Sequence, residues 1–164
     1  MCIRDREKRV VTVMFCDIRS FTAIAERIAP IDLVMLLNQH FTAMTEIIFQ
    51  HAGTLDKFIG DEVMAVFGAP LAAPDDAEQC VRAAMAMQAR NEELNALRES
   101  AGQPTFEVGI GINTGETVAG YVGSPDRMEF TVVGDSVNVA RRFCALAAPG
   151  QVVIGEATFQ MVER

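Results

Sequence analysis

The stretch Leu55-Asp-Lys-Phe-Ile-Gly-Asp-Glu-Val-Met-Ala-Val-Phe-Gly68 contains two short apolar runs on either side of the dipeptide Gly60-Asp61. Because glycine tolerates the positive φ of a tight turn, this pattern predicts a β-hairpin. Asp61 would lie at its tip and Lys57 on the strand that enters the turn. A solvated surface hairpin is one interpretation of this stretch alone, since aspartate is common in turns.

A second stretch, Val10-Val-Thr-Val-Met-Phe-Cys-Asp17, is almost continuously apolar and ends at an acidic residue. Runs of this kind are typical of strands that are buried on both faces of a sheet. An unpaired carboxylate at the end of such a strand is costly to bury. Asp17 and Asp61, at the ends of neighbouring strands, can instead hold a divalent cation such as Mg²⁺, which is usually bound by carboxylates together with substrate phosphates.

The composition is that of one globular domain. The chain has 164 residues, of which half are apolar and 22% are charged, and its net charge is −8. A nucleic-acid surface would require a basic face, so we expect no nucleic-acid partner. A polyanionic substrate would need metal ions or a local basic pocket. The four cysteines are far apart and predict free thiols rather than disulfides or a zinc site. His40 and His51 lack metal-site spacing and are expected at the surface or at the edge of the core.

No apolar run reaches the ~18 residues that a membrane span needs, and no signal peptide precedes the apolar strand. We therefore expect no membrane contact by this segment. The charged opening, residues 1–8, has no pattern that belongs to a core and is interpreted as a linker remnant or an artefact.

The rest of the chain predicts alternating helices and paired strands. Helices are expected at Phe21–Ile28, over an apolar face from Leu33 to Ile48, at Asp76–Glu99, from Gly134 to Arg142 and at Glu156–Val162. Strands are expected at Phe106–Asn113, Thr117–Val122, Met128–Val133 and Gln151–Ile154, with a turn at Thr114-Gly115. The glycines of this region do not fit a dinucleotide loop, because a strand rather than a helix follows them; they indicate close packing of strands. The fold class is therefore α+β, a ferredoxin-like mixed sheet with helices on one face.

Four motifs in this order carry a family resemblance: Phe15-Cys-Asp-Ile-Arg-Ser-Phe-Thr22, Lys57-Phe-Ile-Gly-Asp-Glu-Val-Met-Ala-Val-Phe-Gly68, Gly109-Ile-Gly-Ile-Asn-Thr-Gly115 and Gly134-Asp-Ser-Val-Asn-Val-Ala-Arg-Arg142. Over residues 9–164 the chain resembles the catalytic domain of class III adenylate/guanylate cyclases, whose ferredoxin-like core agrees with the expected order of elements. The family domain usually continues through two more strands that bear another phosphate-binding lysine, so we expect this domain to be C-terminally incomplete.

The resemblance implies roles in metal binding and in reading the base. Asp17 and Asp61 match the two metal-binding aspartates, with the Ile18 carbonyl as a further ligand, for two Mg²⁺ or Mn²⁺ ions per active site. Lys57 and Thr131 match the residues that read the base. Guanylate cyclases typically carry Glu and Cys at these two positions, so this pair favours ATP.

Further residues match the part of the family site that handles ribose and phosphate. Asn138 and Arg142 match the pair that orients the ribose and stabilises the pentavalent phosphorus. Arg127 matches an arginine that grips the triphosphate. Arg141 departs from the family pattern, in which a small residue is common, so it either faces solvent or crowds the pocket.

The resemblance implies an adenylate cyclase that converts ATP to 3′,5′-cyclic AMP and pyrophosphate for intracellular signalling. Family sites combine residues of two subunits, which implies a homodimer, and the glycine-rich strands from Gly115 to Phe130 are the candidate interface. We expect an upstream regulatory or sensory domain and a cytoplasmic location, either free or as the cytoplasmic part of a membrane-anchored protein.

Two alternatives remain at this point. The first is a guanylate cyclase, against which Lys57 and Thr131 count. The second is a catalytically silent module for nucleotide binding or dimerisation. The turn Gly60-Asp61-Glu62 is only superficially similar to the signature of diguanylate cyclases, because the second glycine and the phenylalanine of that signature are missing.

Overall fold

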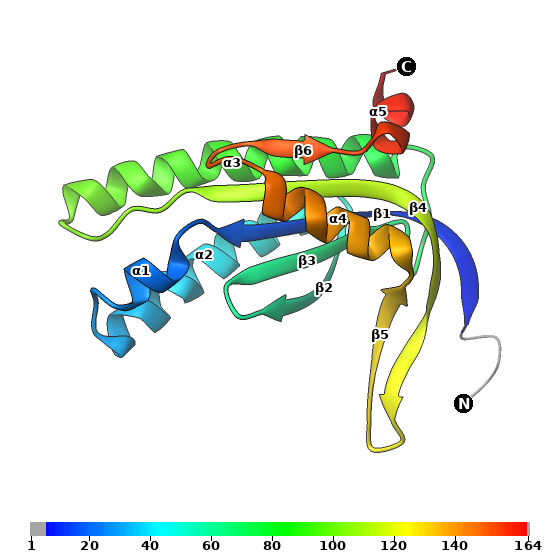
Figure 1. The fold of residues 1–164 in the computed structure, drawn as a ribbon, viewed down its shortest axis with the longest axis horizontal. Coiled ribbons are helices and arrows are strands. Elements are labelled where there is room, and N and C mark those ends of the chain that lie inside the picture. Colours follow the sequence, from blue (N-terminus) through cyan, green and yellow to red (C-terminus); the bar gives the residue numbers. More distant parts are fainter. Residues whose placement is uncertain (1–5, 164) are drawn as a thin grey trace.

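The computed structural model describes residues 6–163 as a mixed sheet covered by helices (Figure 1). In chain order the elements are β1 (Glu7–Ile18), α1 (Phe21–Ala25), α2 (Pro30–Gln50), β2 (Thr54–Ile59), β3 (Glu62–Phe67), α3 (Asp76–Ser100), β4 (Val108–Ser124), β5 (Arg127–Val133), α4 (Asp135–Leu146), β6 (Val152–Ile154) and α5 (Glu156–Val162). The strands are ordered β2-β3-β1-β4-β5, all antiparallel, and β6 pairs in parallel with β4. The α+β mixed-sheet prediction is confirmed.

The predicted hairpin is confirmed. β2 and β3 pair antiparallel around a turn in which Gly60 has a φ of +61°. β3 is buried along its whole length, as its continuous apolar run requires. β1 lies next to β3 at the centre of the sheet, so the C-terminal end of β1 meets the β2–β3 turn.

The predicted turn at Thr114-Gly115 is wrong, because β4 runs unbroken through these residues. Thr114 pairs with Thr12 of β1, and Gly115 pairs with Val11. The buried Thr114 hydroxyl is satisfied by the hydroxyls of Thr12, at 2.9 Å, and Thr158, at 2.8 Å. Gly115 serves a close approach instead of a turn, since a Cβ there would lie 2.0 Å from the Ser136 hydroxyl oxygen.

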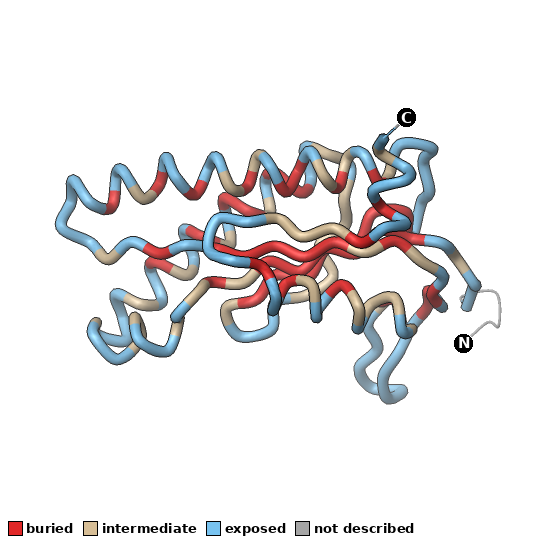
Figure 2. Tube along the Cα trace, turned by 45° about the horizontal axis from the view of Figure 1, so that its top comes forward, coloured by how far each residue is buried: buried red, intermediate tan, exposed pale blue. Residues whose placement is uncertain are grey.

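Helices cover both faces of the sheet, which corrects the prediction that they lie on one face. Met14 and Cys16 of β1 point into a core with α2 and α3, whereas Val13 and Phe15 point into a second core with Ala140 of α4. Figure 1 shows α4 crossing in front of the strands and α2 behind them. In Figure 2 the buried residues follow the central strands and the inner side of α3. The α4 face is the one that carries the candidate site.

Several local predictions need correction. Strand pairing begins at Glu7, so Glu7 and Lys8 belong to β1, while residues 1–5 lie outside the described part. α1 ends at Ala25 rather than Ile28. His40 is fully buried between α2 and Phe106, not at the surface or core edge.

The prediction of free thiols holds for the three cysteines that the structure describes. Cys16, Cys80 and Cys144 are free and buried, whereas Cys2 lies outside the described range. Among residues 6–163, no helix has both the length and the apolar character that crossing a membrane would demand.

Candidate functional site

The two predicted metal-binding aspartates meet at one end of the sheet. Asp17 is the penultimate residue of β1, and Asp61 lies in the β2–β3 turn. The backbone N–H of Ile18 donates a hydrogen bond of 3.0 Å to Asp61 Oδ2, which ties the turn to the end of β1. The structure therefore brings together the three residues Asp17, Ile18 and Asp61.

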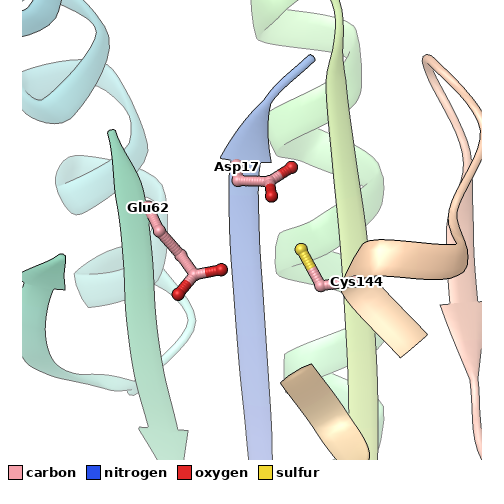
Figure 3. Close-up of side chains that lie close together, drawn as sticks. All are labelled: Asp17, Glu62 and Cys144. Atoms are coloured by element: carbon pink, nitrogen blue, oxygen red, sulfur yellow. The ribbon is translucent and has the colours of Figure 1, made fainter. Parts of the chain in front are cut away.

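Two further side chains converge on Asp17 and were not predicted. Glu62 of β3 and Cys144 of α4 each place a ligand-type atom within 4.8 Å of Asp17 and of one another (Figure 3). Glu62 is 8% exposed. Its position directly after Asp61 was the available signal, but the strand alternation that turns it toward the α4 face is visible only in the fold.

Burial governs the electrostatics of these carboxyl groups. It raises the pKa of Asp17, as does the nearby Asp61 carboxylate, while the Arg19 guanidinium 3.3 Å away acts in the opposite direction. Burial also raises the pKa of Glu62, partly offset by Arg141 at 3.2 Å. Asp17 Oδ1 and Glu62 Oε1 are buried and accept no hydrogen bond from the described residues.

These oxygens fit a hard divalent cation. Carboxylate oxygens are among the ligands that Mg²⁺ and Mn²⁺ prefer. Cys144 does not suit such an ion, because burial raises the pKa of its thiol to about 12 and the thiol donates to the Gly109 carbonyl. A thiol has to lose its proton before it can bind a metal. A cation held here would therefore be bound by the carboxylate oxygens and not by the thiol.

Arg141 faces solvent, with its side chain 56% exposed, and it also contacts the site. Its Nε lies 3.2 Å from Glu62 Oε1, and its guanidinium lies 5.9 Å from the centre of the Phe15 ring. Arg141, which departs from the family pattern, therefore pairs with Glu62, an acidic residue that was not predicted from the sequence.

The predicted base-reading residues form a second cluster. The Thr131 hydroxyl of β5 donates a 2.6 Å hydrogen bond to Asp56 Oδ2 of β2. Lys57 Nζ lies 3.5 Å from Asp56 Oδ1 and 3.8 Å from Glu129 Oε2. β2 and β5 are the end strands of the sheet order, so this side-chain contact connects the two ends of the open sheet. Lys57 and Thr131 are brought together through Asp56, which sequence reasoning overlooked.

The remaining predicted site residues stay apart from both clusters. Asn138 and Arg142 lie one helical turn apart on the exposed side of α4, opposite the buried Ala140 and Cys144. Arg127 is exposed at the turn between β4 and β5. Within residues 6–163, no side-chain hydrogen bond or ion pair connects any of these three to another residue.

Glycines let α4 lie directly on the sheet. A Cβ on Gly111 would lie 2.1 Å from the backbone nitrogen of Cys144 and 2.6 Å from the carbonyl oxygen of Ala140. A Cβ on Gly109 would lie 1.9 Å from the Arg19 guanidinium. The glycines were expected to mark close packing between strands; at Gly111 the close neighbour is instead the α4 backbone, and at Gly109 it is the Arg19 side chain.

Comparison with known proteins places this chain among nucleotide cyclases. Residues 3–164 match the family model of the adenylate and guanylate cyclase catalytic domain. The chain is 40% identical over 135 residues to "Adenylate cyclase 1" of Rhizobium meliloti, a match that covers 82% of this chain and 20% of the relative. It therefore spans about a fifth of the length of that curated relative.

Solved structures agree with this match. The adenylyl cyclase CyaB from P. aeruginosa superposes with a TM-score of 0.93 at 34% identity, covering 96% of this chain and 82% of that one. The guanylyl cyclase Cya2 superposes with a TM-score of 0.91 at 37% identity, covering 95% and 79%. The strand-end carboxylates, the hairpin and the α4 motif thus lie in a fold that both kinds of cyclase share, and the chain belongs to the class III adenylate/guanylate cyclase catalytic domain family.

Proposed function

We propose that this chain is the catalytic domain of an adenylate cyclase, which converts ATP to 3′,5′-cyclic AMP and pyrophosphate for intracellular signalling. The observation that carries the choice of ATP is the single cluster that joins Lys57 and Thr131. A lysine donor beside a threonine hydroxyl matches the edge of adenine, which offers a ring-nitrogen acceptor and an amino donor.

The reaction is an in-line displacement at phosphorus. The ribose 3′-oxygen forms a bond to the α-phosphorus, the bond to the bridging oxygen of pyrophosphate breaks, and the hydroxyl proton is released. Asp17, Asp61 and the Ile18 carbonyl would hold two Mg²⁺ or Mn²⁺ ions. When bound, such ions acidify the attacking hydroxyl and neutralise the leaving group.

The other site residues act on ribose and phosphate. Arg142 stabilises the charge that develops on the phosphoryl oxygens, a role suited to a planar guanidinium. Asn138 orients the ribose, and Arg127 binds the triphosphate. The acidic net charge of −8 makes such locally gathered cations necessary for binding a polyanion.

A homodimer would bring these groups to the carboxylates. Asn138 and Arg142 are exposed and free of side-chain partners within the described range, as expected of residues that complete a site on a second subunit. The β4–β5 ribbon projects from the molecule (Figure 1) and exposes Val118, Tyr121 and Val122. In a two-fold dimer each interface patch meets its own copy, so two equivalent sites form.

A guanylate cyclase is the second candidate, favoured by the similarity to Cya2. Because the match covers only 20% of the curated relative, we also propose that a regulatory domain lies elsewhere in the full-length protein and that the cyclase domain is cytoplasmic.

Turnover with ATP and GTP, each with Mg²⁺ and with Mn²⁺, tests the proposal when products are resolved by chromatography. We expect cyclic AMP as the main product, and no product from Asp17→Ala or Asp61→Ala. Asp32→Ala, at an exposed aspartate on α2, is the matched control and should retain activity. Cyclic GMP as the main product, or full activity in either site variant, would contradict the proposal.

A further inference from the structure

Asp56 is a buried carboxylate between the two residues expected to read the base. Its side chain is 3% exposed, and it lies at the point where the β2–β3 register shifts between Leu55 and Lys57. This irregularity lets Asp56 and Lys57, which are consecutive in the chain, approach one another with their charged ends 3.5 Å apart. The placement is specific, because Asp56 also reaches Thr131 on the far edge strand.

The hydrogen bond from Thr131 to Asp56 determines what the hydroxyl can do next. A threonine hydroxyl has one hydrogen and two lone pairs, whereas a carboxylate only accepts. The 2.6 Å separation of the two oxygens lies in the range of strong charge-assisted bonds. Because the single hydrogen is committed to Asp56, Thr131 presents only lone pairs to a ligand.

Lys57 supplies the complementary half of the pattern. Its ammonium group donates and cannot accept, and it lies between the carboxylates of Asp56 and Glu129. The cluster therefore presents one fixed donor and one fixed acceptor. Adenine offers an acceptor at its ring nitrogen and a donor at its amino group, so both positions match. Guanine offers a ring N–H and the O6 acceptor, so both positions clash.

We propose that Asp56 is a positioning residue which makes Thr131 an obligate hydrogen-bond acceptor and thereby sets the preference for ATP over GTP. The inference rests on the proposed cyclase function and deepens it. Without Asp56 the hydroxyl could turn its hydrogen toward guanine O6, and Thr131 would accept either base. The choice of base in this domain thus depends on Asp56 together with Lys57 and Thr131.

The test is the variant Asp56→Asn. An asparagine amide can donate to the Thr131 oxygen and free the hydroxyl hydrogen for the ligand. The readout is the ratio of kcat/KM for ATP to that for GTP, together with the ratio of affinities for 3′-deoxy-ATP and 3′-deoxy-GTP, which lack the attacking hydroxyl. We expect both ratios to fall by about tenfold to a hundredfold, as when a polar site loses its discrimination.

Three further variants separate positioning from stability. Thr131→Ser keeps the hydroxyl and should keep the ratio, whereas Thr131→Val should lower it. Asp56→Asn added to Thr131→Val should change the ratio no further, because Asp56 acts through the hydroxyl. Glu129→Gln, which removes the other carboxylate near Lys57, is the matched control and should leave the ratio high. The melting temperature of each variant reports its stability separately.

The possible results separate a failure of the Asp56 proposal from a failure of the proposed cyclase activity. A wild-type protein that makes no cyclic nucleotide would refute the proposed cyclase, while the affinity ratio would still test Asp56. A wild-type affinity ratio near one, or an unchanged ratio in folded Asp56→Asn, would overturn the role of Asp56. If Asp56→Asn does not fold, an unchanged ratio in Thr131→Val overturns the inference equally.

Discussion

Replacing Gly111 by alanine should separate α4 from the sheet without replacing a residue of the site. The added Cβ would lie 2.1 Å from the Cys144 nitrogen, and ordinary contact begins at 3.4 Å, so the helix has to retreat by about 1.3 Å. The obstructing atoms belong to the α4 backbone, which cannot rotate away as a side chain would. The movement is carried to Asn138 and Arg142, because both lie on the same helix.

Both stability and activity should respond. Overpacking of this kind costs about 1–3 kcal/mol, and for a chain of this size each kcal/mol lowers the melting temperature by roughly 2–4 °C. A displacement of about 1 Å of groups around a reacting centre can lower the rate by about 10²-fold. The assay is cyclic AMP production together with thermal unfolding.

The matched control for Gly111→Ala is Glu116→Ala, at an exposed position on the same strand. The control should keep its activity and its melting temperature. Wild-type kcat/KM and an unchanged melting temperature in Gly111→Ala would refute the idea that glycine packing positions α4.

Three other predictions concern metal, acid and base choice. The pKa of Asp17 is raised in the folded protein, so the folded state loses stability as the pH rises through that pKa and the carboxyl ionises. Asp17→Asn removes this loss and should therefore raise the metal-free melting temperature at neutral pH. In the same assay Mn²⁺ at 100 times its Kd should stabilise the wild type by about 2.7 kcal/mol and the variant not at all, and equal shifts in both would exclude Asp17 as a ligand. Burial lowers the pKa of His40 to about 4, so acid favours the unfolded state from about pH 6.5 down to 4. In urea denaturation, the free energy of unfolding of His40→Met should fall by about 3 kcal/mol less than that of the wild type between pH 7 and 4. An equal fall in both proteins would count against a buried neutral histidine. Lys57→Glu with Thr131→Cys should weaken ATP use and improve GTP use in paired turnover assays, and an unchanged preference would remove both residues from base recognition.

Strong local patterns made the centre of the fold predictable. Continuous apolar runs identified β1 and β3, and the positive φ of Gly60 matches the turn expected between β2 and β3. Asp17 and Asp61 could be placed together because they end or connect strands that neighbour one another. The prediction of a turn at Thr114-Gly115 was wrong because glycine permits close approach as readily as a turn. Only the position of α4 decides between the two.

Contacts between distant elements could not be predicted. His40 has the spacing of an ordinary helix residue, and its burial depends on Phe106 from a distant segment. Arg141 was noticed only as a departure, since its partner Glu62 lies 79 positions earlier in the chain. The role of Asp56 could not be predicted because its partner Thr131 lies on β5, at the other end of the sheet and 75 positions later in the chain. These contacts depend on tertiary geometry that no local period encodes.

Subunit complementation tests whether each active site is shared between two subunits. Full-length Asp17→Ala and Arg142→Ala homodimers should each be inactive, because every site lacks one component. A mixed dimer has one site with both lesions and one with none, so activity should return to at most about half the wild-type value. Mixed dimers that form, as shown by differently tagged subunits, yet make no cyclic AMP would contradict the shared site and require the residues to converge within one chain.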